Sequence, residues 1–181
     1  LQTCLKEAGY NTLAVVSNPW LKYHQNYFKD GFTHFEFVIS DSWEERGIFN
    51  TTELVTQAVL NFLNTKLDTN GRNFYYIHYL DPHDPYHSPA AFDFFSGELP
   101  QNPIFIHHVS GEEELKAQLI KDPNYAGLPI PHPIPQNIVD YKVSKYDSEI
   151  RYVDDNLGKL LDTLQEMKIL DDSLIIITSD H

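Results

Sequence analysis

Basic residues, cysteine and long apolar runs are all scarce in this 181-residue sequence. Its 13 Lys and Arg are outnumbered by 26 Asp and Glu, so the formal net charge is −13. Because nucleic-acid binding depends on cations that neutralise phosphates, this balance excludes a simple nucleic-acid binder and argues against adsorption to a membrane through a basic face. Cys4 is the single cysteine, which excludes an intrachain disulfide and a multi-cysteine metal site. No apolar run is long enough to predict a transmembrane helix.

Short apolar runs are present instead, and they alternate with helical patterns. Residues 12–17, 34–40 and 74–80 are predicted to be strands, and residues 174–177 a further strand near the end of the sequence. Strands that are apolar almost throughout, and that are separated by helices, are typical of a mainly parallel sheet covered on both faces. The sequence therefore predicts an α/β fold.

Two helices are predicted from capping and periodicity. Asn50, followed three positions later by Glu53, predicts a helix start with a capping box, and a stripe of apolar side chains follows it. A much longer helix of about seven turns is predicted over residues 139–164, where apolar side chains recur every three or four residues. Residues from about 87 to 136, which are rich in proline, are predicted to form a loop-rich excursion between these helices.

Two of the predicted strands end in Asp and His. The strand at 74–80 continues into Asp81-Pro-His83-Asp84-Pro-Tyr86, and the strand at 174–177 leads to Asp180 and His181. In parallel sheets, ligands bind just beyond the carboxyl ends of the strands. We therefore expect both clusters at the same edge of the sheet.

The chemistry of these clusters leaves alternatives open. Asp180 and His181 suit a hard or borderline divalent cation, but two ligands are too few for a complete site, and the pair could equally be a loop cap beside an incidental histidine. The prolines on both sides of His83 stiffen its loop, so that its imidazole could donate to an anionic oxygen or protonate a leaving group. The same loop could instead be a turn whose polar side chains bind local backbone groups.

Three stretches of the sequence, taken together, resemble the sulfatase family of the alkaline-phosphatase-like superfamily. They occur in the order found in the family and cover residues 5–12, residues 79–86, and residues 146–161 with 172–181. The resemblance implies a three-layer α/β/α sandwich with a mainly parallel sheet, here incomplete. It identifies residues 1–181 as the central part of a single sulfatase catalytic domain.

The resemblance also implies an activity and a set of site residues. It implies hydrolysis of a small sulfate ester, possibly on a carbohydrate, with the help of a divalent metal, most often Ca²⁺ and otherwise Mn²⁺ or Mg²⁺. Asp180 and His181 match the late metal ligands of the family, and His83 matches the histidine that contacts the sulfate or the bridging oxygen. The nucleophile of the family, a formylglycine made in a Cys/Ser-x-Pro-x-Arg motif, has no match in this sequence. We therefore expect the 181-residue chain alone to be inactive.

One departure from the family pattern leaves the substrate open. Ser17-Asn18-Pro19-Trp20 stands where many members carry Gly-Lys-Trp-His, so Asn18 could donate a hydrogen bond to the substrate but brings no charge. A phosphodiesterase or phosphonate monoester hydrolase of the same superfamily is therefore an alternative. An alternative of a different class is a non-catalytic relative that binds glycans. The sequence predicts no particular cellular compartment.

Overall fold

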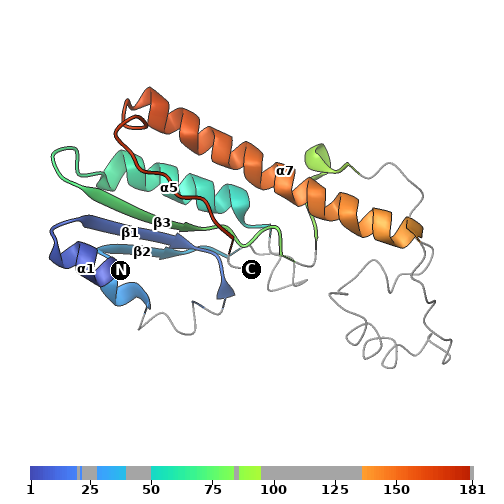
Figure 1. Ribbon diagram of the computed structural model, residues 1–181, viewed down its shortest axis with the longest axis horizontal. Helices are drawn as coiled ribbons and strands as arrows, with labels where there is room; N and C mark the ends of the chain where they lie inside the picture. Colours follow the sequence, from blue (N-terminus) through green and yellow to red (C-terminus); the bar gives the residue numbers. More distant parts are fainter. Residues whose placement is uncertain (20, 22–27, 40–49, 84–85, 95–135, 180–181) are drawn as a thin grey trace.

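The computed structural model describes residues 1–19, 21, 28–39, 50–83, 86–94 and 136–179 (Figure 1). Its strands form one parallel sheet in the order β2-β1-β3. They are β1 (Asn11–Val16), β2 (His34–Phe37) and β3 (Asn73–His78). The predicted strands at 12–17, 34–40 and 74–80 are therefore confirmed to within a few residues at their ends.

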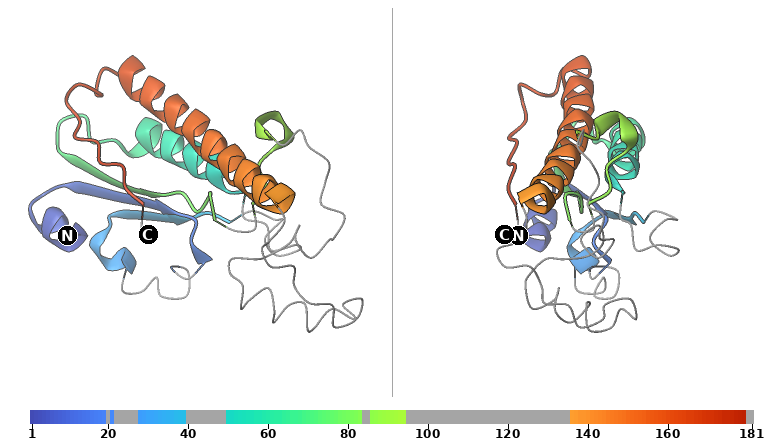
Figure 2. Two further views of the ribbon diagram at one scale, coloured as in Figure 1. Left: turned by 45° about the vertical axis from the view of Figure 1, so that its right-hand side comes forward. Right: turned by 90° about the vertical axis from the view of Figure 1, so that its right-hand side faces the viewer.

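Helices lie on both faces of this sheet, as an α/β fold requires. Figures 1 and 2 show α5 and α7 together on one face and α1 on the other. The helices are α1 (Gln2–Glu7), α5 (Thr52–Lys66) and α7 (Gln136–Glu166), with short 3₁₀ turns η1 (Lys29–Gly31) and η2 (Ala90–Phe92). Within the described residues, no helix is both long and apolar enough to cross a membrane.

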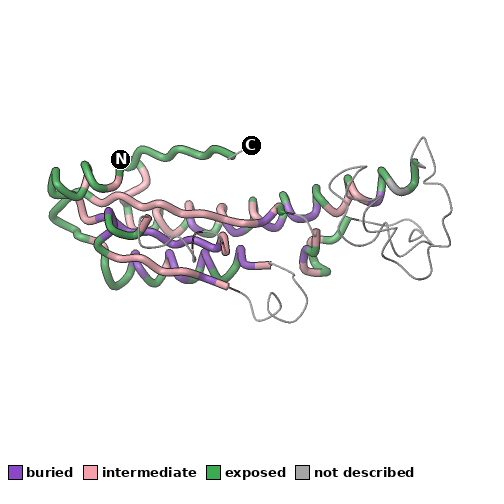
Figure 3. The backbone as a smooth tube through the Cα atoms, turned by 90° about the horizontal axis from the view of Figure 1, so that it is seen from below, coloured by how far each residue is buried: buried purple, intermediate pink, exposed green. Residues whose placement is uncertain are grey.

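The central strand β1 is buried on both sides because its side chains alternate between two apolar layers. Leu13 and Val15 pack against α5, in a core that also includes Val55 and Val59. On the other face, the register places Ala14 beside aromatic residues of β2 and β3. The rings that cluster there, with centroids 5.2–6.4 Å apart, belong to Phe28, Phe32, Phe35, Phe74 and Tyr76. Figure 3 shows the resulting burial of β1 along its length.

Only the C-terminal half of α7 packs on this core. Leu160 is buried, with Leu157 and Leu164 beside it. A 31-residue helix is about 46 Å long, whereas a six-residue strand spans about 20 Å, so the first half of α7 extends past the sheet (Figure 1). The apolar stripe predicted there is exposed, to between 38% and 51%, at Val139, Val143, Tyr146 and Ile150.

The prediction of a strand at 174–177 is wrong. The segment is extended and runs alongside the sheet in the direction of the strands (Figures 1 and 3), but it pairs with no described strand. Leu174 and Ile176 are 89% and 77% exposed. An apolar run of this length indicates an extended segment, but it does not show which strand the segment pairs with.

Two tyrosine hydroxyls, one within β3 and one just after it, differ in their hydrogen bonding. The Tyr79 hydroxyl shares a 3.0 Å hydrogen bond with that of Thr56 on α5. The Tyr75 hydroxyl is buried and has no hydrogen-bond partner among the described residues. Burial raises the pKa of Tyr75 from 10.0 to about 12.

We expect Tyr75→Phe to raise the free energy of unfolding by up to about 1 kcal/mol, because it removes an unpaired buried hydroxyl, and Tyr79→Phe to lower it by about 1 kcal/mol. The raised pKa gives a second readout. The unfolded chain releases the Tyr75 proton near pH 10 and the folded protein only near pH 12, so the wild type loses stability as the pH rises from 10 through 12, whereas Tyr75→Phe does not. Urea titrations at pH 7 and pH 11 measure both effects. A loss of stability in Tyr75→Phe at pH 7 would contradict the assignment.

Candidate functional site at the carboxyl edge of the sheet

Ser17 ties the carboxyl ends of β1 and β3 together. Its buried hydroxyl donates to the carbonyl oxygen of His78 and accepts from the backbone N–H of Leu80, both at 3.0 Å. These two hydrogen bonds extend the contact between β1 and β3 past their last paired residues. The residue after Ser17 is Asn18, so the polar side chain predicted to bind the substrate follows directly from this junction.

Asp81, the first residue of the Asp-Pro-His loop, is only 4% exposed and binds the first turn of α5. Its Oδ2 accepts hydrogen bonds from the N–H of Thr51 at 3.0 Å, the N–H of Thr52 at 2.9 Å and the hydroxyl of Thr52 at 2.6 Å. A carboxylate is favourable at this position because the first N–H groups of a helix lack partners within the helix and carry partial positive charge. Asp81 therefore caps a helix that lies far from it in sequence.

The predicted capping box of Asn50 and Glu53 is wrong for the same reason. The helix begins at Thr52, and its N-cap residue, Thr51, makes no side-chain capping hydrogen bond. The acceptor comes from Asp81, about 30 positions along the chain. A capping rule that uses only neighbouring residues does not find such a partner.

Tyr152 on α7 binds the next backbone N–H in the first turn of α5, that of Glu53. Its hydroxyl accepts a hydrogen bond from the N–H of Glu53 at 3.2 Å, and its ring packs against that of Phe92, with centroids 5.1 Å apart. Burial raises the pKa of Tyr152 to about 12, and the nearby charges of Glu53 and Asp81 act in the same direction. The hydroxyl therefore stays neutral. The start of α5 is thus bound both by Asp81 of the loop after β3 and by Tyr152 of α7.

His83 is exposed on the loop that Asp81 holds, just beyond the end of β3. Asn18 is partly buried just beyond the end of β1, the strand that pairs with β3 in parallel. The structure thus brings these two predicted site residues to the same edge of the sheet. Pro82 fixes φ between Asp81 and His83, so the loop leaves the helix cap in a restricted direction.

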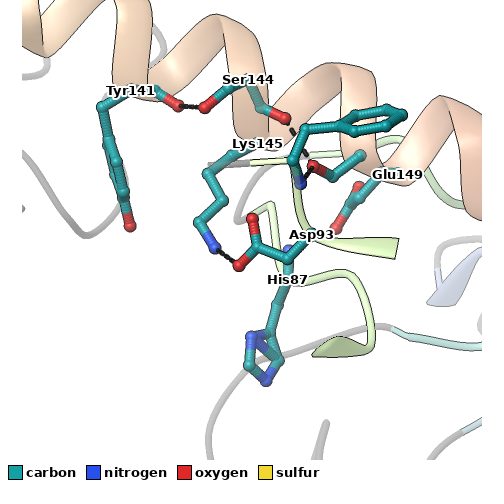
Figure 4. Close-up of polar contacts among 8 residues, drawn as sticks. His87, Asp93, Tyr141, Ser144, Lys145 and Glu149 are labelled. Carbon is teal, nitrogen blue, oxygen red and sulfur yellow. Dashed lines mark hydrogen bonds and ion pairs between the residues drawn. The ribbon is translucent and has the colours of Figure 1, made fainter. Parts of the chain in front are cut away.

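The chain after this loop is held against α7 by several polar contacts (Figure 4). The N–H of His87 donates to the buried carboxylate of Glu149, and Lys145 forms an ion pair with Asp93. The N–H of Phe94 donates to the hydroxyl of Ser148 at 2.8 Å. Figure 4 shows the imidazole of His87 pointing away from the carboxylate that binds its backbone. The N-terminal half of α7 thus supports the loop side of the candidate site.

Other predicted features lie outside the described residues. These are the expected metal ligands Asp180 and His181, together with most of the predicted loop-rich excursion, residues 95–135. Within the part of the chain that the structure describes, no three His, Cys, Asp or Glu residues are grouped so that they could hold a metal ion.

The comparison with known proteins identifies the family of this chain. In parallel α/β sheets, ligands generally bind at the carboxyl edge, which is where Asn18 and His83 lie. The chain matches the model of the sulfatase family over residues 1–181, and it belongs to that family.

Among solved structures, the chain is similar to one described as BT4656 in complex with its substrate D-glucosamine-2-N,6-O-disulfate. The two are 18% identical with a TM-score of 0.47, and the match covers 94% of this chain and 47% of the other. The chain therefore spans about half the length of that protein. No curated protein sequence matches it.

Proposed function

We propose that this chain provides part of the substrate site of a sulfatase that hydrolyses sulfate esters, possibly on a carbohydrate. The observation that carries the proposal is the position of His83. It follows a strand end at the carboxyl edge of a parallel sheet, on a loop held by a buried carboxylate, in a chain of the sulfatase family. His83 is also exposed at that edge.

In this proposal His83 donates a hydrogen bond to an oxygen of the ester group and stabilises negative charge as the ester bond breaks. Asn18, beyond the neighbouring strand, donates its amide N–H to the same anionic group. Neither contact by itself neutralises the charge of the ester. A chain with a net charge of −13 repels an anion over longer distances, so the proposal includes a cation at the site.

For that cation we propose Asp180 and His181 as two of its ligands. A carboxylate with an imidazole suits Ca²⁺, Mn²⁺ or Mg²⁺, with Ca²⁺ preferred from the family resemblance. The described chain reaches residue 179 by running alongside the sheet in the direction of its strands (Figure 1). When bound, the cation would polarise the ester oxygens as a Lewis acid.

We expect Asp180→Asn in the full-length protein to weaken Ca²⁺ binding by at least about 10-fold, because it removes an anionic ligand. Calorimetric titration and the Ca²⁺-dependent rise in melting temperature measure the effect without an activity assay. Asp172→Asn is the matched control, because Asp172 is exposed and precedes the extended segment. Equal Ca²⁺ affinity in the wild type and Asp180→Asn would contradict the ligand assignment.

Hydrolysis of matched esters by the full-length protein tests the function. The same alcohol is offered as its sulfate, its methyl phosphate diester and its methylphosphonate monoester, and kcat/KM is compared. The proposal predicts preferred cleavage of the sulfate ester. Preferred cleavage of the phosphate or the phosphonate would favour a phosphodiesterase or phosphonate hydrolase of the same superfamily. Binding of a sulfated saccharide without cleavage of any ester would favour a non-catalytic glycan-binding protein.

A further inference from the structure

The carboxylate of Asp81 binds the start of α5 and not its own loop. A buried carboxylate is costly unless hydrogen bonds and charge compensate it. All three hydrogen bonds to Oδ2 come from the start of α5, residues 51 and 52, and none of them comes from the loop that carries Asp81. The hydroxyl of Thr51, which could have capped the helix locally, has no partner among the described residues. The helix cap thus depends on a residue of the strand-end loop.

The same loop is fixed at the preceding residue as well. Leu80 donates its N–H to the buried hydroxyl of Ser17, so two consecutive residues are held by different parts of the chain, the residue after β1 and the start of α5. After Asp81 come Pro82, whose φ is fixed by its ring, and then the exposed His83. Because Pro82 has no polar side-chain group, Asp81 is the last residue before the histidine whose side chain can anchor the loop through hydrogen bonds.

We infer that Asp81 is a positioning residue, whose carboxylate fixes the direction in which His83 is presented to the substrate. This inference rests on the proposed function of His83 as a substrate-binding donor. Tyr152 supports the arrangement by holding the next N–H of α5, so that the helix start to which Asp81 binds cannot shift freely. Misplacement of a reacting group by about 1 Å can reduce a rate by about 100-fold.

The variant Asp81→Asn tests the inference, because it keeps one side-chain oxygen that can accept from α5 but removes the charge. In the full-length protein we expect kcat/KM to fall by about 10- to 100-fold. The loss should vanish when the same substitution is made in a His83→Ala background, because an effect exerted through His83 is not additive with its removal. Leu63→Ala, at the far end of α5, is the control for a general loss of stability and should leave kcat/KM unchanged below its melting temperature.

An NMR signal reports on His83 independently of activity. With histidine labelled at Cε1, the His83 resonance, assigned with His83→Gln, should shift or broaden in Asp81→Asn, while that of His34 on β2 stays in place. An unchanged His83 resonance would overturn the inference, whether or not the protein is active. So would an equal loss of kcat/KM with and without His83. Absence of ester hydrolysis in the wild type would instead refute the proposed function, and the NMR result would still decide the role of Asp81.

Discussion

Replacement of His83 by alanine in the full-length protein is expected to reduce kcat/KM for sulfate-ester hydrolysis by about 10²- to 10³-fold. A positioned donor to the ester group contributes about this much, because it stabilises charge that develops as the bond breaks. The side chain is exposed, so its removal creates no cavity, and the melting temperature should hardly change. Initial-rate kinetics together with thermal unfolding measure both quantities.

The matched control is His34→Ala. His34 is the first residue of β2, at the edge of the sheet opposite to the candidate site, and its ring lies 6.2 Å from that of Phe62. Its removal can reduce stability but should leave kcat/KM within about 2-fold of the wild type. Equal activity of His83→Ala and the wild type would show that the loop histidine plays no part in hydrolysis.

Leu63→Ala is expected to lower the free energy of unfolding by about 3 kcal/mol. Leu63 is 4% exposed and belongs to the core between α5 and the sheet, together with Leu13 and Leu160. Truncation removes buried apolar surface and leaves a cavity, and buried leucines lose about 2–5 kcal/mol in such substitutions. Chemical denaturation of the wild type and the variant measures the difference.

Leu54→Ala on the same helix provides the control for this prediction. Leu54 is 40% exposed and lies in the first turn of α5, so the same change in side chain removes little buried area. Because both variants replace leucine by alanine within one helix, their difference reports burial and not helix propensity. A loss of less than about 1 kcal/mol in Leu63→Ala would mean that the core between α5 and the sheet is not packed as described.

Features of the fold that depend on local pattern were predictable from the sequence. The run at 12–17 contains residues buried on both faces, which is why its centre, residues 13–16, is apolar and forms the central strand. The three-to-four-residue spacing along α7 likewise predicts a helix. It did not predict that Val143 would be half exposed, because the length of the neighbouring strands, and not the helix itself, decides how much of that face is covered.

Features that depend on distant partners were not predictable in the same way. The extended segment at 174–177 has the composition of a strand, but its pairing depends on a neighbour that composition does not identify. The true cap of α5 is Asp81, whereas Asn50 and Glu53 satisfied a local rule. No spacing rule links residue 52 to residue 81, so only the folded chain shows the contact.

In the candidate site, too, some residues could be predicted from the sequence and others could not. His83 was found from the sequence because it follows a strand end, and Asn18 from the resemblance to the sulfatase family, and the structure places both of them at the same edge of the sheet. The residues that hold this edge, Ser17 and Tyr152, carry no sequence signal of their own. One is a single hydroxyl after an apolar strand, and the other is one aromatic residue of a periodic helix. Their roles follow from hydrogen bonds to residues more than 60 positions away.

The central claim is that His83 contacts the anionic ester group at the carboxyl edge of the sheet. A crystal structure of the full-length protein with a sulfated monosaccharide bound tests it most directly. We predict a ring nitrogen of His83 at about 2.7–3.2 Å from an oxygen of the sulfate group, with Asp81 still bound to the N–H groups of Thr51 and Thr52. A sulfate group bound beyond hydrogen-bonding reach of His83 would contradict the claim.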